Sequence, residues 1–351
     1  MAARFPDGVT VKLLGVVLAL ATAAALAPAP SDAQTVGEVF RKVTPSVVVI
    51  RARGREVSSG SEVGYSETGS GVLISADGKV VTAAHVVNTT DAITVEVIGG
   101  ESVAARVIAS EPAADLSMIQ LERVPKGAQV AKLSNSDTVR VGDQVLVVGA
   151  PYGLSHSLSV GYISARWAPN TVYRSMPLAE FFQTDAVINT GNSGGPIFNM
   201  AGEVIGIVSH NISKGGGSEG LGFVVTWNTA RQLLLEKRSV WTGIEGEILT
   251  ERQADVLNCP PGVLGYLVKV VAQGSPTEAM GLRGGNSTAV IDGRTLVVGG
   301  DIIISVNGIP VRSAADLVQI RDEVNRQPPN TPIKAQVLRQ GRIVELSGKL
   351  E

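Results

Sequence analysis

The chain of 351 residues has few of the side chains that build metal sites and disulfides. It carries one cysteine, Cys259, and three histidines, His85, His156 and His210. One cysteine excludes an intrachain disulfide and a cysteine-cluster metal site, and three scattered histidines leave little for a zinc site. We therefore expect no metal ion and no disulfide.

The chain also has no large excess of positive or negative charge. The chain has 30 Lys and Arg against 32 Asp and Glu, so its formal net charge is −2. Without a basic field it has no electrostatic footprint for nucleic acid, which we exclude as a partner. Signatures of ATP binding are absent, and we expect no cofactor. The 44% of hydrophobic residues provides ample material for a packed core.

The apolar run near the N-terminus is too short to span a membrane. It covers residues 13–27, follows Arg4 and Lys12, and ends at Pro28, whereas a spanning helix needs ~20 apolar residues. Small residues at 31–33 complete the pattern of a cleavable signal peptide. We expect export to the periplasm. An exported eukaryotic protein usually carries disulfides, and this chain, with one cysteine, can form none within itself. The alternative is a retained inner-membrane anchor with the protein facing the periplasm.

Glycine, in contrast, is abundant, with 40 residues, which suits a protein with many tight turns. Between residues 46 and 225, short β-branched runs alternate with turn residues, without long helical patterns between them. Such spacing indicates an all-β sandwich or barrel. The polar, Gly- and Ser-rich stretch at residues 53–68 predicts a mobile loop.

The length predicts two folded domains. Residues 35–43 form a short predicted helix that Pro45 stops, and Asn228 is the expected N-cap of a helix that links the β region to a second domain. A further helix is predicted at residues 313–324. The resulting division is a signal peptide at 1–33, an N-terminal helical segment at 34–44, a β domain at 45–227, a linker helix at 228–240 and a C-terminal domain at 241–351.

A serine inside a Gly-rich turn is the most informative feature of the sequence. Residues 191–196 read GNSGGP, with Ser193 at the centre. Closely spaced backbone N–H groups in such a turn can stabilise an oxyanion beside an exposed hydroxyl. A serine nucleophile also needs a base, and the base needs an orienting partner. His85 at the end of an apolar strand and Asp115 before an alternating strand are the candidates.

These segments resemble the HtrA/Deg family of trypsin-like serine proteases. The resemblance covers residues 43–351 and is carried by TAAH at 82–85, DL at 115–116, QTDA at 183–186, GNSGGP at 191–196, GSG at 69–71 and LGFV at 221–224. It implies a mainly β fold, a trypsin-like double six-stranded β-barrel. It also implies that Ser193 is the nucleophile, His85 the general base, Asp115 its orienting partner, and the amides of Gly191 and Ser193 the oxyanion hole.

The resemblance also places five residues around the substrate, namely Ile188, Asn192, Leu221, Gly222 and Phe223. An isoleucine five residues before the nucleophile narrows the specificity pocket and favours Val, Ala or Ile before the cut. Asp185 could suggest a basic preference, but its position eight residues before Ser193 favours a structural role.

The C-terminal region resembles the PDZ domain of the same family. The matching segments are WTGI at 241–244, GSP at 274–276, AMGL at 279–282, GDIIISVNG at 300–308 and ADL at 315–317. The resemblance implies a small α+β fold that binds peptide C-termini at Trp241, Thr242, Gly243 and Ile244. An insertion at residues 286–298 departs from the family pattern and is expected to change the rim of the groove.

The sequence thus predicts a periplasmic, ATP-independent serine endopeptidase of protein quality control and stress response. Its expected partners are unfolded or misfolded proteins and C-terminal peptides. Two alternatives stay open: a catalytically idle chaperone or PDZ peptide sensor, and a regulatory protease that cleaves one membrane-bound target. Family members are commonly trimers, and Phe40 is a candidate for that contact.

Overall fold

The computed structural model describes residues 34–58, 61–97, 100–154, 156–173, 175–213 and 217–350. The expected signal peptide lies outside these ranges. Within them, no helix combines the length and the apolar character needed to cross a membrane. The described chain begins with helix α2 (Val36–Val43), as predicted, and the ring of Phe40 packs in part against the neighbouring core.

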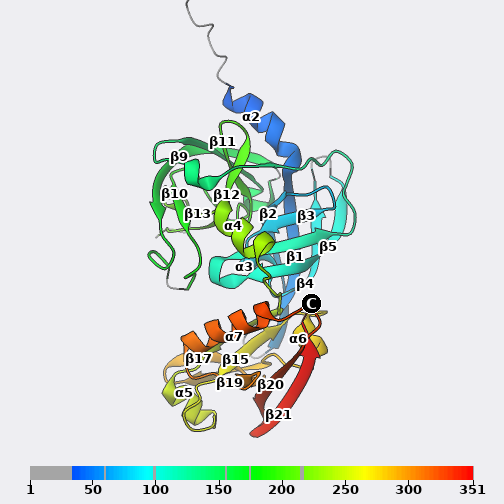
Figure 1. Cartoon of the computed structure of the whole chain (residues 1–351), viewed down its shortest axis with the longest axis vertical. Coiled ribbons are helices and arrows are strands. Elements are labelled where there is room, and N and C mark those ends of the chain that lie inside the picture. Colours follow the sequence, from blue (N-terminus) through cyan, green and yellow to red (C-terminus); the bar gives the residue numbers. More distant parts are fainter. Residues whose placement is uncertain are drawn as a thin grey trace, which may run out of the picture. The chain divides into compact units, whose positions relative to one another are not determined.

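Six strands close the first β-barrel (Figure 1). Strand β4 pairs back with β1, so the ring is complete and leaves no open sheet edge. Helix α3 (Ala84–Val87) follows β3 directly. In the order of the ring, the strands are β1 (Val47–Ser58), β2 (Ser61–Leu73), β3 (Lys79–Thr82), β6 (Leu116–Leu121), β5 (Ser102–Glu111) and β4 (Thr90–Glu96).

A second ring of six strands closes where β11 pairs with β12, and the short β7 (Lys132–Leu133) adds to it in parallel. The double six-stranded barrel predicted from the sequence is therefore confirmed. The ring consists of β11 (Pro196–Asn199), β8 (Gln144–Gly149), β9 (Ser157–Trp167), β10 (Phe181–Thr184), β13 (Gly222–Thr226) and β12 (Glu203–Asn211).

Three apolar cores stabilise the two barrels and the contact between them. One fills the first barrel and includes Val48 and Ile50, and another fills the second barrel. The third lies between the barrels, where Val47 meets Leu146 and Phe198. Because strands such as β1 contribute to cores on both faces, their sequences are continuous apolar runs and do not alternate.

The prediction of a mobile loop at residues 53–68 is wrong for the residues that the structure describes. Strand β1 extends to Ser58 and β2 begins at Ser61, in unbroken antiparallel register. A Cβ atom at Gly54 would lie 2.7 Å from the ring of Tyr65 on the opposite strand. The glycine that suggested a loop therefore makes room for a cross-strand aromatic ring.

The linker helix also differs from its prediction. Helix α4 (Trp227–Arg231) continues as a π-helical turn, η5 (Gln232–Glu236), and ends there. Thr226 occupies the N-cap position, two residues before the predicted cap Asn228. Asn228 is not the cap, because its amide group is engaged elsewhere: it donates to Asn135 at 2.7 Å and accepts from the Ser136 amide at 3.4 Å.

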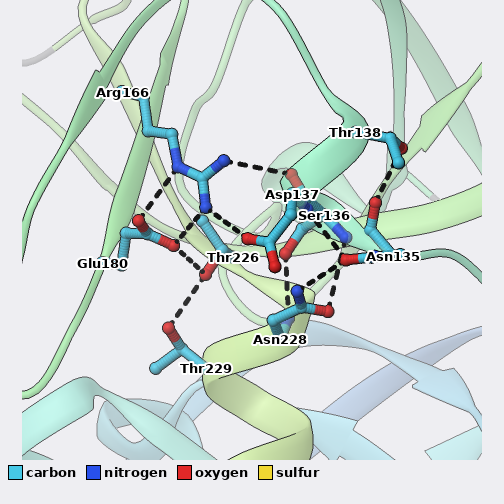
Figure 2. A network of polar contacts seen from close by, with 9 residues as sticks. All are labelled: Asn135, Ser136, Asp137, Thr138, Arg166, Glu180, Thr226, Asn228 and Thr229. Carbon is cyan, nitrogen blue, oxygen red and sulfur yellow. Dashed lines mark hydrogen bonds and ion pairs between the residues drawn. The ribbon is translucent and has the colours of Figure 1, made fainter.

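These bonds belong to a polar network that ties α4 to the second barrel (Figure 2). Arg166 on β9 lies at its centre and forms an ion pair with Glu180 at 2.9 Å and another with Asp137 at 2.7 Å. Thr226 donates to the same glutamate and also bonds Thr229 in the first turn of α4. The network fixes the start of the helix by side-chain contacts with residues distant in sequence.

The C-terminal part forms a separate six-stranded sheet, and β14 lies at its edge. Helix α7 (Ala314–Arg326) lies where a helix was predicted, and Ser313 is its N-cap, with a hydroxyl that accepts from the Asp316 amide. The other elements are β14 (Ile244–Ile248), α5 (Glu251–Val256), β15 (Tyr266–Val271), α6 (Pro276–Ala279), β18 (Ile302–Val306), β19 (Ile309–Pro310), β20 (Pro332–Arg339) and β21 (Arg342–Lys349).

The predicted insertion at residues 286–298 is a β-hairpin, formed by β16 (Ser287–Ile291) and β17 (Arg294–Val298). Its turn residues Asp292 and Gly293 both have positive φ, as a two-residue type I′ turn requires. Arg294 forms an ion pair with Glu247 on β14 at 2.8 Å. The hairpin is thus attached to the edge strand of the sheet.

Candidate active site

His85 and Asp115 lie together at the edge of the first barrel. Asp115 has a left-handed backbone conformation (φ 54°) just before β6, and this turn directs both its carbonyl and its carboxylate at α3. The Ala84 amide donates to the Asp115 carbonyl at 3.1 Å, and the His85 amide donates to Oδ1 at 3.1 Å. His85 Nδ1 lies 2.9 Å from Oδ1 and 3.0 Å from Oδ2. The carboxylate therefore fixes both the backbone and the ring of the histidine.

Ser209 on β12 is the second partner of this carboxylate. Its hydroxyl donates to Asp115 Oδ2 and lies 2.9 Å from Nδ1 of His210. Since the single hydroxyl proton goes to Asp115, Nδ1 of His210 must carry the proton of the second bond. His210 Nε2 then has a lone pair, and this buried atom has no partner in the described structure.

An aromatic cluster surrounds His210. The ring stacks on Phe223 with centroids 5.4 Å apart and meets Tyr173 edge-on at 4.0 Å. Burial lowers the pKa of His210 to about 4. The histidine is therefore neutral at physiological pH and supports Ser209 as an uncharged donor.

The Ser193 turn is held by glycines that no other residue could replace. Gly191 (φ 99°) and Gly194 (φ 80°) have left-handed conformations. A Cβ atom at Gly191 would lie 2.2 Å from the Ala150 carbonyl oxygen, and one at Gly194 would lie 2.1 Å from Thr82 Oγ1. The GNSGGP sequence is thus required by the close packing of this turn against both barrels.

Ser70 on β2 clamps the same turn. Its amide donates to the Ser193 carbonyl at 2.8 Å, and its hydroxyl donates to the Gly191 carbonyl at 2.7 Å. The Ala150 amide in turn donates to the Ser70 hydroxyl at 3.0 Å. This clamp engages the two carbonyls and does not involve the amides of Gly191 and Ser193. Neither amide has an acceptor within the described structure. Two free donors beside a serine hydroxyl are what an oxyanion hole requires.

The Ser193 hydroxyl donates to the Ser209 carbonyl at 3.3 Å. Among the hydrogen bonds of the described residues, none joins Ser193 to His85. Catalytic hydrogen bonds are often long in unliganded enzymes and tighten only when substrate binds.

Opposing effects determine the pKa of His85. Burial lowers it, whereas the hydrogen bond and charge of Asp115, and the charge of Glu67, raise it. The raising effects win, so the pKa lies above the ordinary value of ~6.5. The imidazolium form is therefore favoured once a proton is taken up, as a general base requires.

We expect proteolysis to fall as pH decreases through the raised pKa of His85, because only the neutral imidazole accepts a proton. The half-maximal rate should lie above pH ~6.5. Protonation of His210 should add no further step until about pH 4. A profile of kcat/KM against pH tests this, and a constant value between pH 5 and 8 would exclude His85 as the base.

The predicted pocket residues are mostly buried. Ile188 is 2% exposed, and its side chain occupies the space beside Gly222, where a Cβ atom would lie 2.5 Å from Ile188 Cδ1. Phe223 is 3% exposed and belongs to the aromatic cluster around His210, whereas Leu221 is 37% exposed. Asn192 is 4% exposed, and its side-chain oxygen faces Gly149. The side chain of Asn192 is thus packed inside the site, and its predicted role in substrate binding stays a prediction.

Two residues outside the candidate triad, Asp185 and His156, have backbone partners. Asp185 accepts from the Tyr162 amide at 2.6 Å, in line with the structural role expected for it. His156 Nε2 lies 3.3 Å from the Val47 carbonyl, and no contact joins it to Ser193 within the described residues.

The predicted peptide-binding loop precedes the edge strand of the C-terminal sheet. Gly243 has positive φ (72°) and packs against Ser275, and the Thr242 carbonyl accepts from Thr277. The Trp241 indole donates to the Asn88 carbonyl at 2.8 Å and packs in part against the core of the first barrel. Ile244 opens β14 and, with Leu317 and Ile320 of α7 among others, lines an apolar cavity of about 600 Å³.

Comparison with known proteins agrees with this geometry. The family model of the trypsin-like peptidase domain matches residues 69–207, which defines the class as trypsin-like serine peptidases. The periplasmic pH-dependent serine endoprotease DegQ of Escherichia coli (strain K12) is 32% identical over 349 residues, which is 93% of this chain and 71% of DegQ. The chain belongs to the HtrA/Deg family and is a serine-type endopeptidase.

Further relatives support this assignment. A probable periplasmic serine endoprotease DegP-like of Ectopseudomonas mendocina (strain ymp) is 34% identical over 72% of this chain; the chain spans about half of that relative, 54%. The solved structure of the HtrA-type protease AlgW with a tripeptide is 27% identical in sequence, with a TM-score of 0.52. The match covers 90% of this chain and 96% of the solved chain. The solved structure of AlgW with a decapeptide is 26% identical, with a TM-score of 0.51. The match covers 90% of this chain and 98% of the solved chain.

Sequence reasoning missed three residues of the site: Ser70, Ser209 and His210. Ser70 stands in the GSG segment, where the sequence indicated only a strand. Ser209 has no motif of its own, and its contact with Asp115 joins residues 94 positions apart. The signal that could have found them is a polar residue inside an apolar strand, since Ser209 interrupts the run of β12 and is buried.

Proposed function

We propose that the chain is a periplasmic, ATP-independent endopeptidase that degrades unfolded or damaged proteins with a triad of Ser193, His85 and Asp115. The observation that carries the proposal is the short, doubly contacted Asp115–His85 pair beside a serine turn with two free amides. An idle chaperone would have no need for this combination of an oriented base and unpaired donors.

Each residue has a defined step in the proposed reaction. Ser193 Oγ attacks the scissile carbonyl carbon while His85 Nε2 removes the hydroxyl proton. The negative charge that forms on the carbonyl oxygen is stabilised by the amides of Gly191 and Ser193. His85 then gives its proton to the leaving amine, and water repeats the sequence to release the acyl group. Asp115 holds the imidazole in the tautomer with a proton on Nδ1.

Digestion of unfolded casein without ATP tests the proposal. We expect the chain to cleave casein at many sites and to leave a stably folded protein of similar size uncut. A regulatory protease specific for one membrane-bound target would instead leave casein intact. A fluorophosphonate probe separates that outcome from an idle barrel, because only a competent Ser193 reacts with it.

The specificity pocket is proposed to accept small aliphatic side chains before the cut. Support comes from Ile188, whose side chain takes up the space beside Gly222 and leaves no room for a long side chain there. One carboxylate oxygen of Asp185, Oδ1, accepts from the Tyr162 amide, which supports a structural role for this residue. The cut sites in the casein digest should therefore follow Val, Ala or Ile.

The C-terminal part is proposed to be a PDZ domain that binds peptide C-termini. The positive φ of Gly243 supports a loop whose amides receive a carboxylate. Strand β14 pairs with β15 on one side and borders the cavity lined by α7 on the other. An extended peptide added to this edge would form main-chain hydrogen bonds and place its last side chain among Ile244, Leu317 and Ile320.

Peptide titration into the full-length Ser193→Ala protein tests this domain. We expect a peptide with a free, apolar C-terminus to bind at least tenfold more tightly than its amidated counterpart, because the amide removes the charge that the loop receives. The amidated peptide is the matched control for sequence and length. Equal affinity of the two forms would contradict a carboxylate site.

A further inference from the structure

Glu67 lies on the face of β2 that borders the catalytic residues. Side chains alternate along a strand, so Tyr65, Glu67 and Gly69 share one face. A Cβ atom at Gly69 would lie 2.7 Å from Val86 Cγ1 and 3.1 Å from the Ser193 carbonyl oxygen. This face of β2 is therefore directed at α3, which carries His85, and at the nucleophile turn.

Tyr65 fixes the other end of this face. Its ring packs over Gly54, and its hydroxyl lies beside the side chain of Thr89, which follows α3 in the sequence. Glu67 thus stands between a contact with Thr89 on one side and a contact with Val86 on the other. His85 directly precedes Val86 in the chain, and Glu67 is two residues from Gly69 on the same face of β2, so the Glu67 carboxylate is directed at the segment that carries the catalytic histidine.

Charge interactions agree with this placement. Burial, and to a smaller extent the charge of Asp115, raise the pKa of Glu67, whereas the charge of His85 lowers it. The charge of Glu67 in turn contributes to the raised pKa of His85. The carboxylate is therefore within electrostatic reach of both residues.

Glu67 has no cationic partner among the ion pairs of the described residues. Arg51 and Arg53 on β1 flank Ala52, the residue opposite Glu67, and so belong to the other face of the strand. Arg51 forms an ion pair with Glu96, and Arg55 with Asp91 and Glu62. The basic group whose charge acts on Glu67 is His85, and this ring is neutral when it serves as the general base, so a half-buried carboxylate here favours a ligand that brings a positive charge.

The barrel that carries Glu67 determines which part of a bound substrate this residue can contact. The residues of the proposed pocket for the acyl part, Ile188 and Gly222, belong to the second barrel, whereas Glu67 belongs to the first. His85 must reach the leaving amine to protonate it, so the residues after the scissile bond pass along the first barrel beside His85. They therefore pass beside Glu67.

We propose that Glu67 is a specificity-determining residue that binds the cationic side chain of a lysine or arginine in the first two positions after the scissile bond. The inference rests on the proposed endopeptidase function and adds a substrate class to its leaving-group side. A charge-assisted hydrogen bond in a half-buried site gives about a tenfold preference for the cationic substrate.

Two peptides that differ only in the residue after the cut, lysine or glutamine, test the proposal. The wild type should cleave the lysine peptide with about tenfold higher kcat/KM, and Glu67→Gln should reduce this ratio to about one. Glu67→Lys should reverse the preference when glutamate replaces lysine in the peptide. The matched control is Glu62→Gln, which neutralises an exposed carboxylate on the same strand, paired with Arg55, and should keep the wild-type ratio.

Failure of the inference is separable from failure of the proposed function. Cleavage of both peptides at equal rates by the wild type would overturn the role of Glu67 and leave the endopeptidase intact. Competition binding of the same peptides to the Ser193→Ala protein measures the preference without turnover. Equal binding there would overturn the inference whether or not the wild type is active.

Discussion

Replacing Ser193 with alanine should reduce casein-degrading turnover on the order of 10⁶-fold, the loss that follows removal of a triad nucleophile. The free amides of Gly191 and Ser193 would remain, but no atom could form the acyl intermediate. His85→Ala should cause a similar loss, because the serine hydroxyl then has no proton acceptor and the residues act as a unit. Peptide-bond cleavage measured by release of acid-soluble casein fragments checks both variants.

His156→Ala is the matched control for the histidine variant. His156 contacts the Val47 carbonyl and is not joined to Ser193 or Asp115 by any described hydrogen bond. Its removal should leave turnover within a few-fold of the wild type. Residual activity above a tenth in Ser193→Ala or His85→Ala, with the fold intact by circular dichroism, would refute the triad.

The order and flanks of His85 and Asp115 made their contact predictable. Each residue follows or precedes a short apolar strand, and strand ends are where a barrel brings distant residues together. His85 follows β3 and Asp115 precedes β6, and these two strands are neighbours in the barrel. A local pattern could therefore indicate a non-local contact.

The supporting contacts could not be predicted in the same way. The clamp by Ser70 depends on the Gly191 carbonyl, 121 positions away, and no property of a single serine reveals that distance. The hairpin of β1 and β2 was missed for the same reason. Its glycines and serines have low strand propensity, and the stabilising partner of Gly54 is the ring of Tyr65 on the opposite strand.

The expected effect of Asp115→Asn is nearly as large as that of the serine variant, a fall in kcat of about 10⁴-fold. Asp115 accepts hydrogen bonds from the His85 amide, His85 Nδ1 and the Ser209 hydroxyl. All three are donors, so an acceptor-only carboxylate satisfies them. An asparagine must turn its NH₂ group towards one of them, and at Nδ1 this favours the tautomer with its proton on Nε2, which cannot accept the serine proton.

The measurement is kcat for a peptide derived from a casein cut site, with the melting temperature as a check of folding. Ser209→Ala separates the two partners of Asp115, because it removes one donor and leaves the bond to His85 in place. Its kcat should fall far less than that of Asp115→Asn. Equal losses would mean that Ser209 and not the tautomer of His85 determines the rate, whereas wild-type kcat in Asp115→Asn would remove Asp115 from the mechanism.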